Sequence, residues 1–291
     1  MRTFAEAYEG KAKLIHDRYI KKLAIVRICG IVFALAIGTV TVLFFNMYTA
    51  VASGFFLIMN VRTVIKIQHE AKTKEFIPQI IPALYEITRE KMSVNELNDS
   101  NLMRIKAGSA LEYKGTMNVE VDYHKFKIHD ITIVRRVEGR HASIFEGGLL
   151  ISTPEEFSCR AKLEPDMSEE LEAISLGIEA TGIQKELINM NASLTAKMKN
   201  IMVELTPMEI NGPFRVYADE HEAAARLVDE KYLNRLANMD HKISIYLGND
   251  KFYALIHDVH FADENEPIKD SYDKVYGIVK RLEMLLPFDR S

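Results

Sequence analysis

The sequence predicts an α+β protein, in which an N-terminal transmembrane helical hairpin precedes a soluble mixed domain with an antiparallel sheet and flanking helices. Two observations carry this prediction. No charged side chain occurs between Ile28 and Val61, and Lys and Arg residues bracket that stretch. Beyond residue 104 the apolar residues alternate with a period of two, which is typical of strands with one buried face. We therefore expect a juxtamembrane helix at residues 1–27, the hairpin at residues 28–66 and a cytoplasmic domain at residues 67–291.

The first expected element is an amphipathic helix over residues 4–22. Apolar side chains such as Phe4, Tyr8 and Tyr19 recur there among charged ones. This helix either lies along the membrane surface or continues into the first spanning helix.

The uncharged stretch is too long for one membrane helix and fits two. A bilayer core about 30 Å thick needs about 20 apolar residues as a helix, whereas one helix over residues 28–61 would be about 51 Å long. A hairpin that turns near Phe45–Tyr48 resolves the excess. A cleaved signal peptide is set aside, because the apolar run is too long and has no A-x-A-type cleavage site.

Basic residues on both flanks predict the orientation. Residues 1–27 contain seven basic and three acidic side chains, and the far flank has four basic ones at Arg62, Lys66, Lys72 and Lys74. Because basic residues flank cytoplasmic ends, both ends are expected in the cytoplasm and the uncharged turn outside.

Small residues predict how the two helices pack. Gly30, Ala34 and Gly38 recur every four residues, as do Ala50 and Gly54 in the second segment. Such stripes let helices approach closely in lipid, with Gly38 opposite Gly54 in a hairpin. Two alternatives stay open: the stripe mediates dimerisation, or it only reflects how common Gly and Ala are in membrane helices.

Further elements follow from periodicity and turn residues. A helix over residues 64–92 should break or kink near residue 77, because Pro78 and Pro82 lie inside it. The pair Gly147-Gly148 indicates a bulge or close packing within a strand. The remaining expected elements are strands at 117–123, 125–137, 143–152, 201–206 and 213–218, helices at 168–200, 219–238 and 270–286, and a hairpin of strands 242–247 and 251–258 around Gly248–Asp250.

Nine histidines raise the question of a metal site. His257 and His260 are three residues apart, so on one strand their side chains point to opposite faces, and His124 and His129 share that parity problem. A zinc site needs four converging ligands. The sequence also has no Walker A, G-x-G-x-x-G or G-x-S-x-G pattern. We expect no metal, no cofactor and no catalytic residues.

Charge and cysteine content narrow the partners. The chain has a net charge of −4 and its first 27 residues carry +4, so residues 62–291 carry −8. An acidic domain argues against nucleic acid as a partner, whereas the basic N-terminal stretch suits anionic lipid headgroups.

The only cysteines, Cys29 and Cys159, form no disulfide framework, which fits a reducing compartment. Nothing in the local sequence indicates a reactive thiol at Cys159.

Residues 214–228 (FRVYADEHEAAARLV) resemble the segment F-x-V-Y-x-x-D/E-x-x-E-A-x-x-L of an uncharacterised bacterial membrane family, known as domain of unknown function 3137. Residues 145–151, 202–206 and 243–261 are similar to the same family, so the resemblance spans roughly residues 70–262. It implies a membrane-anchored cytoplasmic domain at a bacterial inner membrane. It brings no established activity and no catalytic residues.

The function expected from these features is that of a membrane-anchored interaction or scaffold protein. Its partners are the lipid bilayer and a protein at the cytoplasmic face, bound through helices 168–200 or 219–238. The alternative is an enzyme acting on a lipid or another membrane-proximal substrate, which a pocket shared by several of His124, His129, His257 and Asp258 would favour. A third hypothesis is a sensor or assembly factor that forms homo-oligomers through the small-residue stripe.

Overall fold

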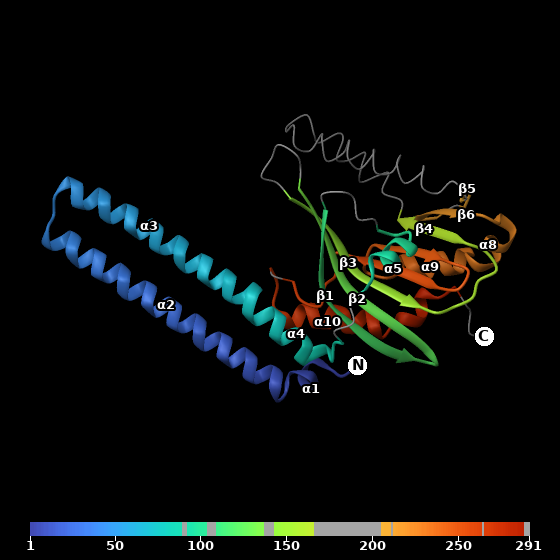
Figure 1. Cartoon of the computed structure of the whole chain (residues 1–291), viewed down its shortest axis with the longest axis horizontal. Helices are drawn as coiled ribbons and strands as arrows, with labels where there is room; N and C mark the ends of the chain where they lie inside the picture. The colour runs from blue at the N-terminus through green and yellow to red at the C-terminus, as the bar shows by residue number, and fades with distance from the viewer. Residues whose placement is uncertain are drawn as a thin grey trace. The chain divides into compact units, whose positions relative to one another are not determined.

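The computed structural model describes residues 1–88, 92–103, 109–136, 143–165, 205–210, 212–263 and 265–287 (Figure 1). The chain divides into two compact units. Unit 1 joins Met1–Thr88 with Phe261–Tyr276, and unit 2 joins Arg89–His260 with Gly277–Ser291. The segment after residue 260 thus returns to the N-terminal helices, about 170 residues further along the chain.

Unit 1 is helical, and its two long helices run side by side (Figure 1). Its helices are α1 (Phe4–Tyr8), α2 (Lys11–Leu43), α3 (Met47–Glu70), the π-helix η1 (Ala71–Phe76), α4 (Ile77–Tyr85) and the first part of α10 (Ile268–Val279). The predicted N-terminal apolar helix pair is confirmed by α2 and α3. The predicted helix over residues 4–22 is interrupted at Gly10, whose φ of +71° favours glycine and ends the helical path. Beyond Gly10, α2 continues into the apolar stretch without a break.

The turn between α2 and α3 lies one or two residues before its predicted position. It consists of Phe44, Phe45 and Asn46. The Asn46 side chain accepts the Thr49 backbone N–H at 2.9 Å, and the Thr49 hydroxyl accepts the Asn46 N–H at 3.0 Å. This reciprocal cap satisfies backbone donors at the start of α3 and fixes where that helix begins.

The break expected near residue 77 takes the form of a π-helix. The Ile77 N–H donates to the Lys72 carbonyl, five residues earlier rather than four. Pro78 follows at once and has no N–H with which to continue the α-helical pattern. The helical path then ends at Tyr85, because Glu86 adopts a left-handed φ of +52°, so the predicted end at residue 92 was too late.

Unit 2 is built on one eight-stranded sheet, in which every pair of neighbouring strands is antiparallel. The order across the sheet is β1-β2-β3-β8-β7-β4-β6-β5. The strands are β1 (Ser109–Val121), β2 (His124–Arg136), β3 (Ser143–Thr153), β4 (Ala161–Pro165), β5 (Thr206–Met208), β6 (Phe214–Ala218), β7 (Ile243–Leu247) and β8 (Phe252–His257). The predicted α+β class with an antiparallel sheet is therefore confirmed. Strand β4 was not predicted.

One local prediction within the first strands needs correction, and one that left two alternatives open is decided. The strand predicted at residues 117–123 extends two residues too far, because Tyr123 is 96% exposed. It forms a two-residue turn with Asp122, and both residues have positive φ, so the alternation ends at Val121. The glycine pair in β3 marks close packing rather than a bulge, because β3 keeps its register on β2 and β8.

The centre of the sheet is buried on both faces, which differs from the predicted wet face. Every residue of β7 is buried. The short helix α5 (Val94–Asp99) covers one face, where Leu97 packs in a cluster with Ile131, Leu150 and Leu255. The alternating pattern is a property of the outer strands and does not extend to the centre.

The remaining helices are shorter than predicted. The helix expected over residues 219–238 is two helices, α8 (His221–Leu227) and α9 (Glu230–Ala237), because the Asp229 carboxylate accepts the Tyr232 N–H at 2.7 Å and starts a new helix. The helix expected over residues 270–286 is α10 followed by the 3₁₀ helix η2 (Leu282–Leu285). The predicted helix 168–200 and most of the strand 201–206 lie outside the described residues.

Candidate functional site

The contact surface between α2 and α3 contains two of the five predicted packing residues. Gly30 and Ala34 are half-buried. The Asn60 side-chain amide donates to the Gly30 carbonyl at 2.9 Å, and a Cβ placed on Gly30 would lie only 2.8 Å from Val64 Cγ2. At Gly30 the absence of a side chain thus lets α3 approach α2 closely, as the small-residue stripe predicts.

The other three predicted packing residues lie elsewhere. Gly38, Ala50 and Gly54 are exposed, and a Cβ on either glycine would meet no atom within 4 Å. The structure does not bring Gly38 opposite Gly54. The Thr41 hydroxyl instead donates to the Ser53 hydroxyl, and this register leaves both glycines on the outer surface of the pair.

The outer surface of the helix pair is apolar and exposed. Both Lys11–Leu43 and the helical path Met47–Tyr85 are long and apolar enough to cross a membrane. Large apolar side chains such as Leu35, Val42 and Ile58 are more than half exposed. An apolar surface on helices joined by polar contacts is compatible with membrane association.

We predict that Gly30→Leu weakens the helix pair and that Gly38→Leu does not. A side chain at residue 30 collides with Val64, and overpacking of this kind costs about 1–3 kcal/mol, whereas residue 38 has open space. The readout is disulfide formation between Thr41→Cys and Ser53→Cys, in a chain whose native cysteines are replaced by serine. Equal crosslinking rates in the two leucine variants would contradict this packing.

The candidate histidines of unit 2 bind separate partners. His129 Nδ1 pairs with the Thr116 hydroxyl at 2.8 Å, and His260 Nδ1 with the fully buried Asp130 carboxylate at 2.7 Å. The remaining pairs are His257 with Ser244 and His124 with Glu155. Within the described part of the chain, no three His, Cys, Asp or Glu residues are grouped so that they could hold a metal ion.

The residues that would have favoured an enzyme are thus dispersed. His124 and His129 contact different partners on opposite faces of β2, and Asp258 follows the end of β8 with a left-handed φ of +58°. Cys159 is buried, and burial together with Asp219 and Glu220 raises the pKa of its thiol, which disfavours the reactive thiolate.

We predict that protonation of His129 makes unit 2 less stable in acid. Burial, with Lys127 nearby, lowers the pKa of His129 from 6.5 to about 4. Between pH 6.5 and 4, His129 is therefore protonated in the unfolded chain but neutral in the folded chain. As the pH falls across that range, the free energy of unfolding decreases by up to about 3 kcal/mol. His129→Gln, which has no titrating group, should remove this part of the slope. Denaturant melts of both proteins at pH 7, 5.5 and 4.5 measure it, and parallel pH profiles would refute the assignment.

A cavity of about 430 Å³ lies within unit 1, where the two long helices leave their uncharged part. We call it the aromatic pocket. Its walls come from α1, α2, η1, α4, the segment before α10 and the first turn of α10. The lining residues are Phe4, Tyr8, His16, Tyr19, Lys72, Phe76, Ile77, Ala262, Asp263, Glu266, Pro267, Ile268 and Lys269.

Aromatic stacking builds one side of the aromatic pocket. The Tyr19 and Phe76 rings stack with centroids 4.3 Å apart, and Phe4 and Tyr8 stack at 5.1 Å. His16 lies between these pairs, with its ring 5.6 Å from Tyr8 and 5.7 Å from Phe76. Burial raises the pKa of the Tyr8 hydroxyl, which therefore stays protonated. The π-helix η1 supplies Phe76, at a type of helical irregularity often found at functional sites.

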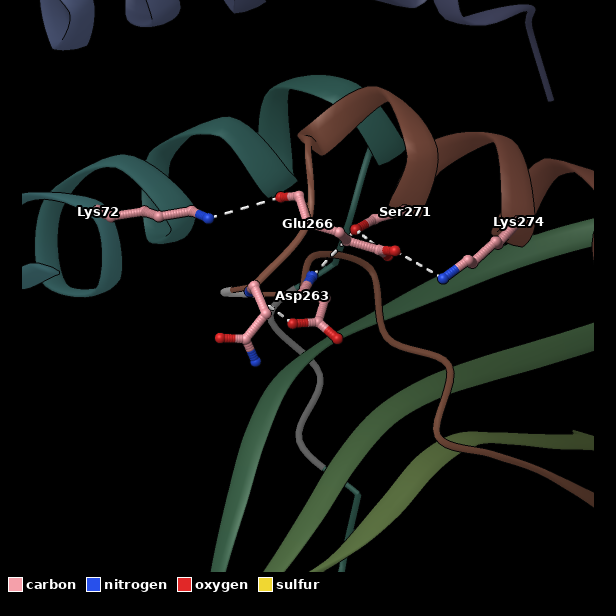
Figure 2. A network of polar contacts seen from close by, with 6 residues as sticks. Lys72, Asp263, Glu266, Ser271 and Lys274 are labelled. Carbon is pink, nitrogen blue, oxygen red and sulfur yellow. Dashed lines mark hydrogen bonds and ion pairs between the residues drawn. The ribbon is translucent and has the colours of Figure 1, made fainter.

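A polar network joins lining residues of the aromatic pocket to α10, as Figure 2 shows. The buried Ser271 hydroxyl accepts the Asp263 backbone N–H at 3.0 Å and donates to Glu266 Oε1 at 2.7 Å. Glu266 Oε2 accepts from the Lys274 ammonium at 2.6 Å, which raises the pKa of Lys274. Lys72 reaches the Glu266 backbone carbonyl at 3.5 Å. These contacts fix the positions of Glu266 and Ser271 relative to one another, and Asp263 and Glu266 both line the pocket.

Further contacts tie the returning segment to the N-terminal helices within unit 1. The Tyr85 hydroxyl donates to the Phe261 carbonyl at 2.8 Å, and the Tyr272 hydroxyl donates to the Arg2 carbonyl at the same distance. Burial raises the pKa of Tyr272 to about 12, so this donor persists at any physiological pH. The aromatic pocket therefore rests on contacts between residues far apart in the chain.

The aromatic pocket offers surfaces for binding: aromatic rings, the imidazole of His16 and charged side chains of both signs. Its lining contains no serine, threonine or cysteine, and Glu266 is engaged by Ser271 and Lys274. Sequence reasoning named Phe4, Tyr8 and Tyr19 as one face of an amphipathic helix and missed their partners. Aromatic residues beside the charged ends of an apolar run were the signal available, since such rings favour membrane–water interfaces.

No family model and no curated protein sequence matches this chain. Among solved structures, a crystal structure of the mycobacterial trehalose monomycolate transport factor A is similar over 62% of this chain and 75% of that chain. The two share 9% sequence identity with a TM-score of 0.32. A likeness this distant says nothing about what this chain binds or does. The resemblance to domain of unknown function 3137 stays a prediction.

Proposed function

We propose that this chain is a membrane-anchored interaction protein, in which α2 and α3 cross the bilayer as a hairpin and unit 2 binds another protein on the side of the membrane where the N-terminus lies. The observation that carries the anchor is the length of the helix pair. The rise along α2 from Arg27 to Phe44 is about 26 Å, and that along α3 from Met47 to Lys66 is about 29 Å. Both lengths are close to the hydrocarbon thickness of about 30 Å.

The polar contacts between the helices support the same proposal. A Thr41–Ser53 pair and an Asn60–Gly30 pair satisfy polar groups that lipid would leave unpaired. The excess of basic residues before Ile28 supports a cytoplasmic position for both termini. At a bacterial inner membrane, the sheet unit would then face the cytoplasm.

Binding rather than catalysis is proposed because the titratable side chains considered for catalysis pair with different neighbours. The surface that we propose for a protein partner is the exposed polar side of α8 and α9, which includes Glu222 and Asn234.

Photocrosslinking from a reactive amino acid at residue 234 tests this part, in membranes that contain the full chain. We expect a discrete protein adduct from residue 234 and none from a matched exposed position, residue 123 in the β1–β2 turn. Adducts of equal yield from both positions, or no adduct from residue 234, would refute binding through this surface.

A further inference from the structure

The aromatic pocket lies at a defined distance from the uncharged part of the helix pair. Tyr19 precedes Arg27 by about 12 Å of helical rise, and Lys72 follows Lys66 by about 9 Å. A headgroup layer extends about 5–8 Å beyond each side of the hydrocarbon. If α2 and α3 cross the bilayer, Tyr19 and Lys72 lie about 1–7 Å beyond this layer, a distance that an extended headgroup can span.

The lining of the aromatic pocket presents both charge signs beside aromatic rings. Asp263 is half-buried and lines the cavity, and its Oδ1 accepts the Asn265 N–H at 2.7 Å. Lys72 lies on the facing helix. Aromatic faces with a carboxylate attract an organic ammonium, and a lysine ammonium attracts phosphate.

These charges distinguish among the lipids that a bilayer offers. An anionic headgroup such as phosphoglycerol carries only a negative charge. It would be repelled by Asp263 and Glu266, both of which line the cavity. A headgroup that carries a primary ammonium next to a phosphate matches both signs. A primary ammonium also donates hydrogen bonds to a carboxylate, which a quaternary ammonium cannot do.

We propose that the aromatic pocket binds the headgroup of an ethanolamine phospholipid from the bilayer that holds the hairpin. The ammonium contacts Asp263 and the rings of Tyr8 and Tyr19, and the phosphate contacts Lys72. This inference rests on the proposed membrane anchor, because only a hairpin within lipid brings a headgroup to this depth.

Native mass spectrometry of the full chain in detergent tests the proposal, with ethanolamine, choline and glycerol phospholipids of identical acyl chains added in equal amounts. We expect the ethanolamine lipid to bind about fivefold better than either competitor. Asp263→Asn keeps the acceptor for Asn265 but removes the charge, and should lower ethanolamine-lipid binding about fivefold. Lys72→Gln should do the same. Asp270→Asn is the matched control, since Asp270 lies on α10 outside the lining, and should change nothing.

Equal binding of the three lipids, or a preference for the glycerol or choline lipid, would overturn the proposal. An unfolded Asp263→Asn variant would leave a second measurement: an ethanolamine lipid with a photoreactive headgroup should label the wild-type chain on peptides that contain Tyr8 or Phe76. Labelling confined to other peptides would also overturn it.

Extraction of the wild-type chain from membranes by alkaline carbonate separates the proposed headgroup pocket from the proposed membrane anchor. A chain that resists extraction but shows no headgroup preference refutes the pocket alone, and a chain that is extracted refutes the anchor as well.

Discussion

Two lysines placed on the outer surface of the helix pair should release the protein from the membrane. Leu35 and Ile58 are 66% and 57% exposed and lie near the middle of the two proposed spans, Arg27–Phe44 and Met47–Lys66. In lipid, each lysine costs about 2.5–3.5 kcal/mol, and each lost apolar side chain adds about 0.5 kcal/mol, so Leu35→Lys with Ile58→Lys opposes insertion by about 6 kcal/mol or more. In water the same changes would replace exposed apolar surface with charge and do no harm.

The measurement is the fraction of full-length protein that stays in the membrane after alkaline carbonate extraction. The wild-type chain should be retained and the double variant extracted or degraded. Leu14→Lys with Ile20→Lys is the control, because both residues are exposed on α2 before the uncharged run. Retention of the Leu35/Ile58 variant at the wild-type level would show that lipid does not cover this surface.

Gly148→Ala should destabilise unit 2 more than any single substitution considered above. A Cβ at residue 148 would lie 2.0 Å from the Ile256 carbonyl oxygen of the neighbouring strand β8. Because the obstacle is backbone in the middle of the sheet, it cannot move aside as a side chain would. Gly148 also has a φ of +152°, which residues with a side chain rarely adopt. We expect a loss of about 3 kcal/mol or more.

Thermal unfolding of the purified full chain, followed by circular dichroism, measures this loss. A decrease of about 10 °C in the unfolding midpoint is expected for a unit of this size. Gly277→Ala makes the same chemical change in α10, where no atom lies within 4 Å, and should raise stability by about 0.5–1 kcal/mol. A Gly148→Ala midpoint within 2 °C of wild type would mean that β3 and β8 are not packed as closely as described.

Local chemistry made much of the fold predictable. The uncharged run gave the helix pair, and the alternation together with Gly248–Asp250 gave the β7–β8 hairpin. Gly147 was expected to allow a bulge or close packing, and its Cβ position 2.3 Å from the Ile131 carbonyl oxygen identifies close packing. Each of these signals comes either from residues that are close together in the sequence or from the exclusion of charged side chains by an apolar environment.

What could not be predicted depends on contacts between distant residues. Nothing near Phe261 indicates that the chain there leaves the sheet and joins Tyr85, since that hydrogen bond links residues 176 apart. The aromatic pocket was missed for the same reason. Gly38 and Gly54 followed a correct rule for close helix packing, but the register set by Thr41 and Ser53 turned them outward. A spacing of four residues shows which residues share one face of a helix, but it does not show whether that face contacts the neighbouring helix.

Side-specific labelling decides whether the helix pair crosses the bilayer twice. The chain would carry serine at residues 29 and 159 and a single cysteine at either residue 45, in the turn, or residue 234, on α9. Intact spheroplasts would be treated from outside with a maleimide that does not cross membranes. We predict that residue 45 reacts and that residue 234 reacts only after lysis. Labelling of residue 234 from outside, or equal protection of both positions until lysis, would contradict a hairpin that spans the membrane with both termini inside.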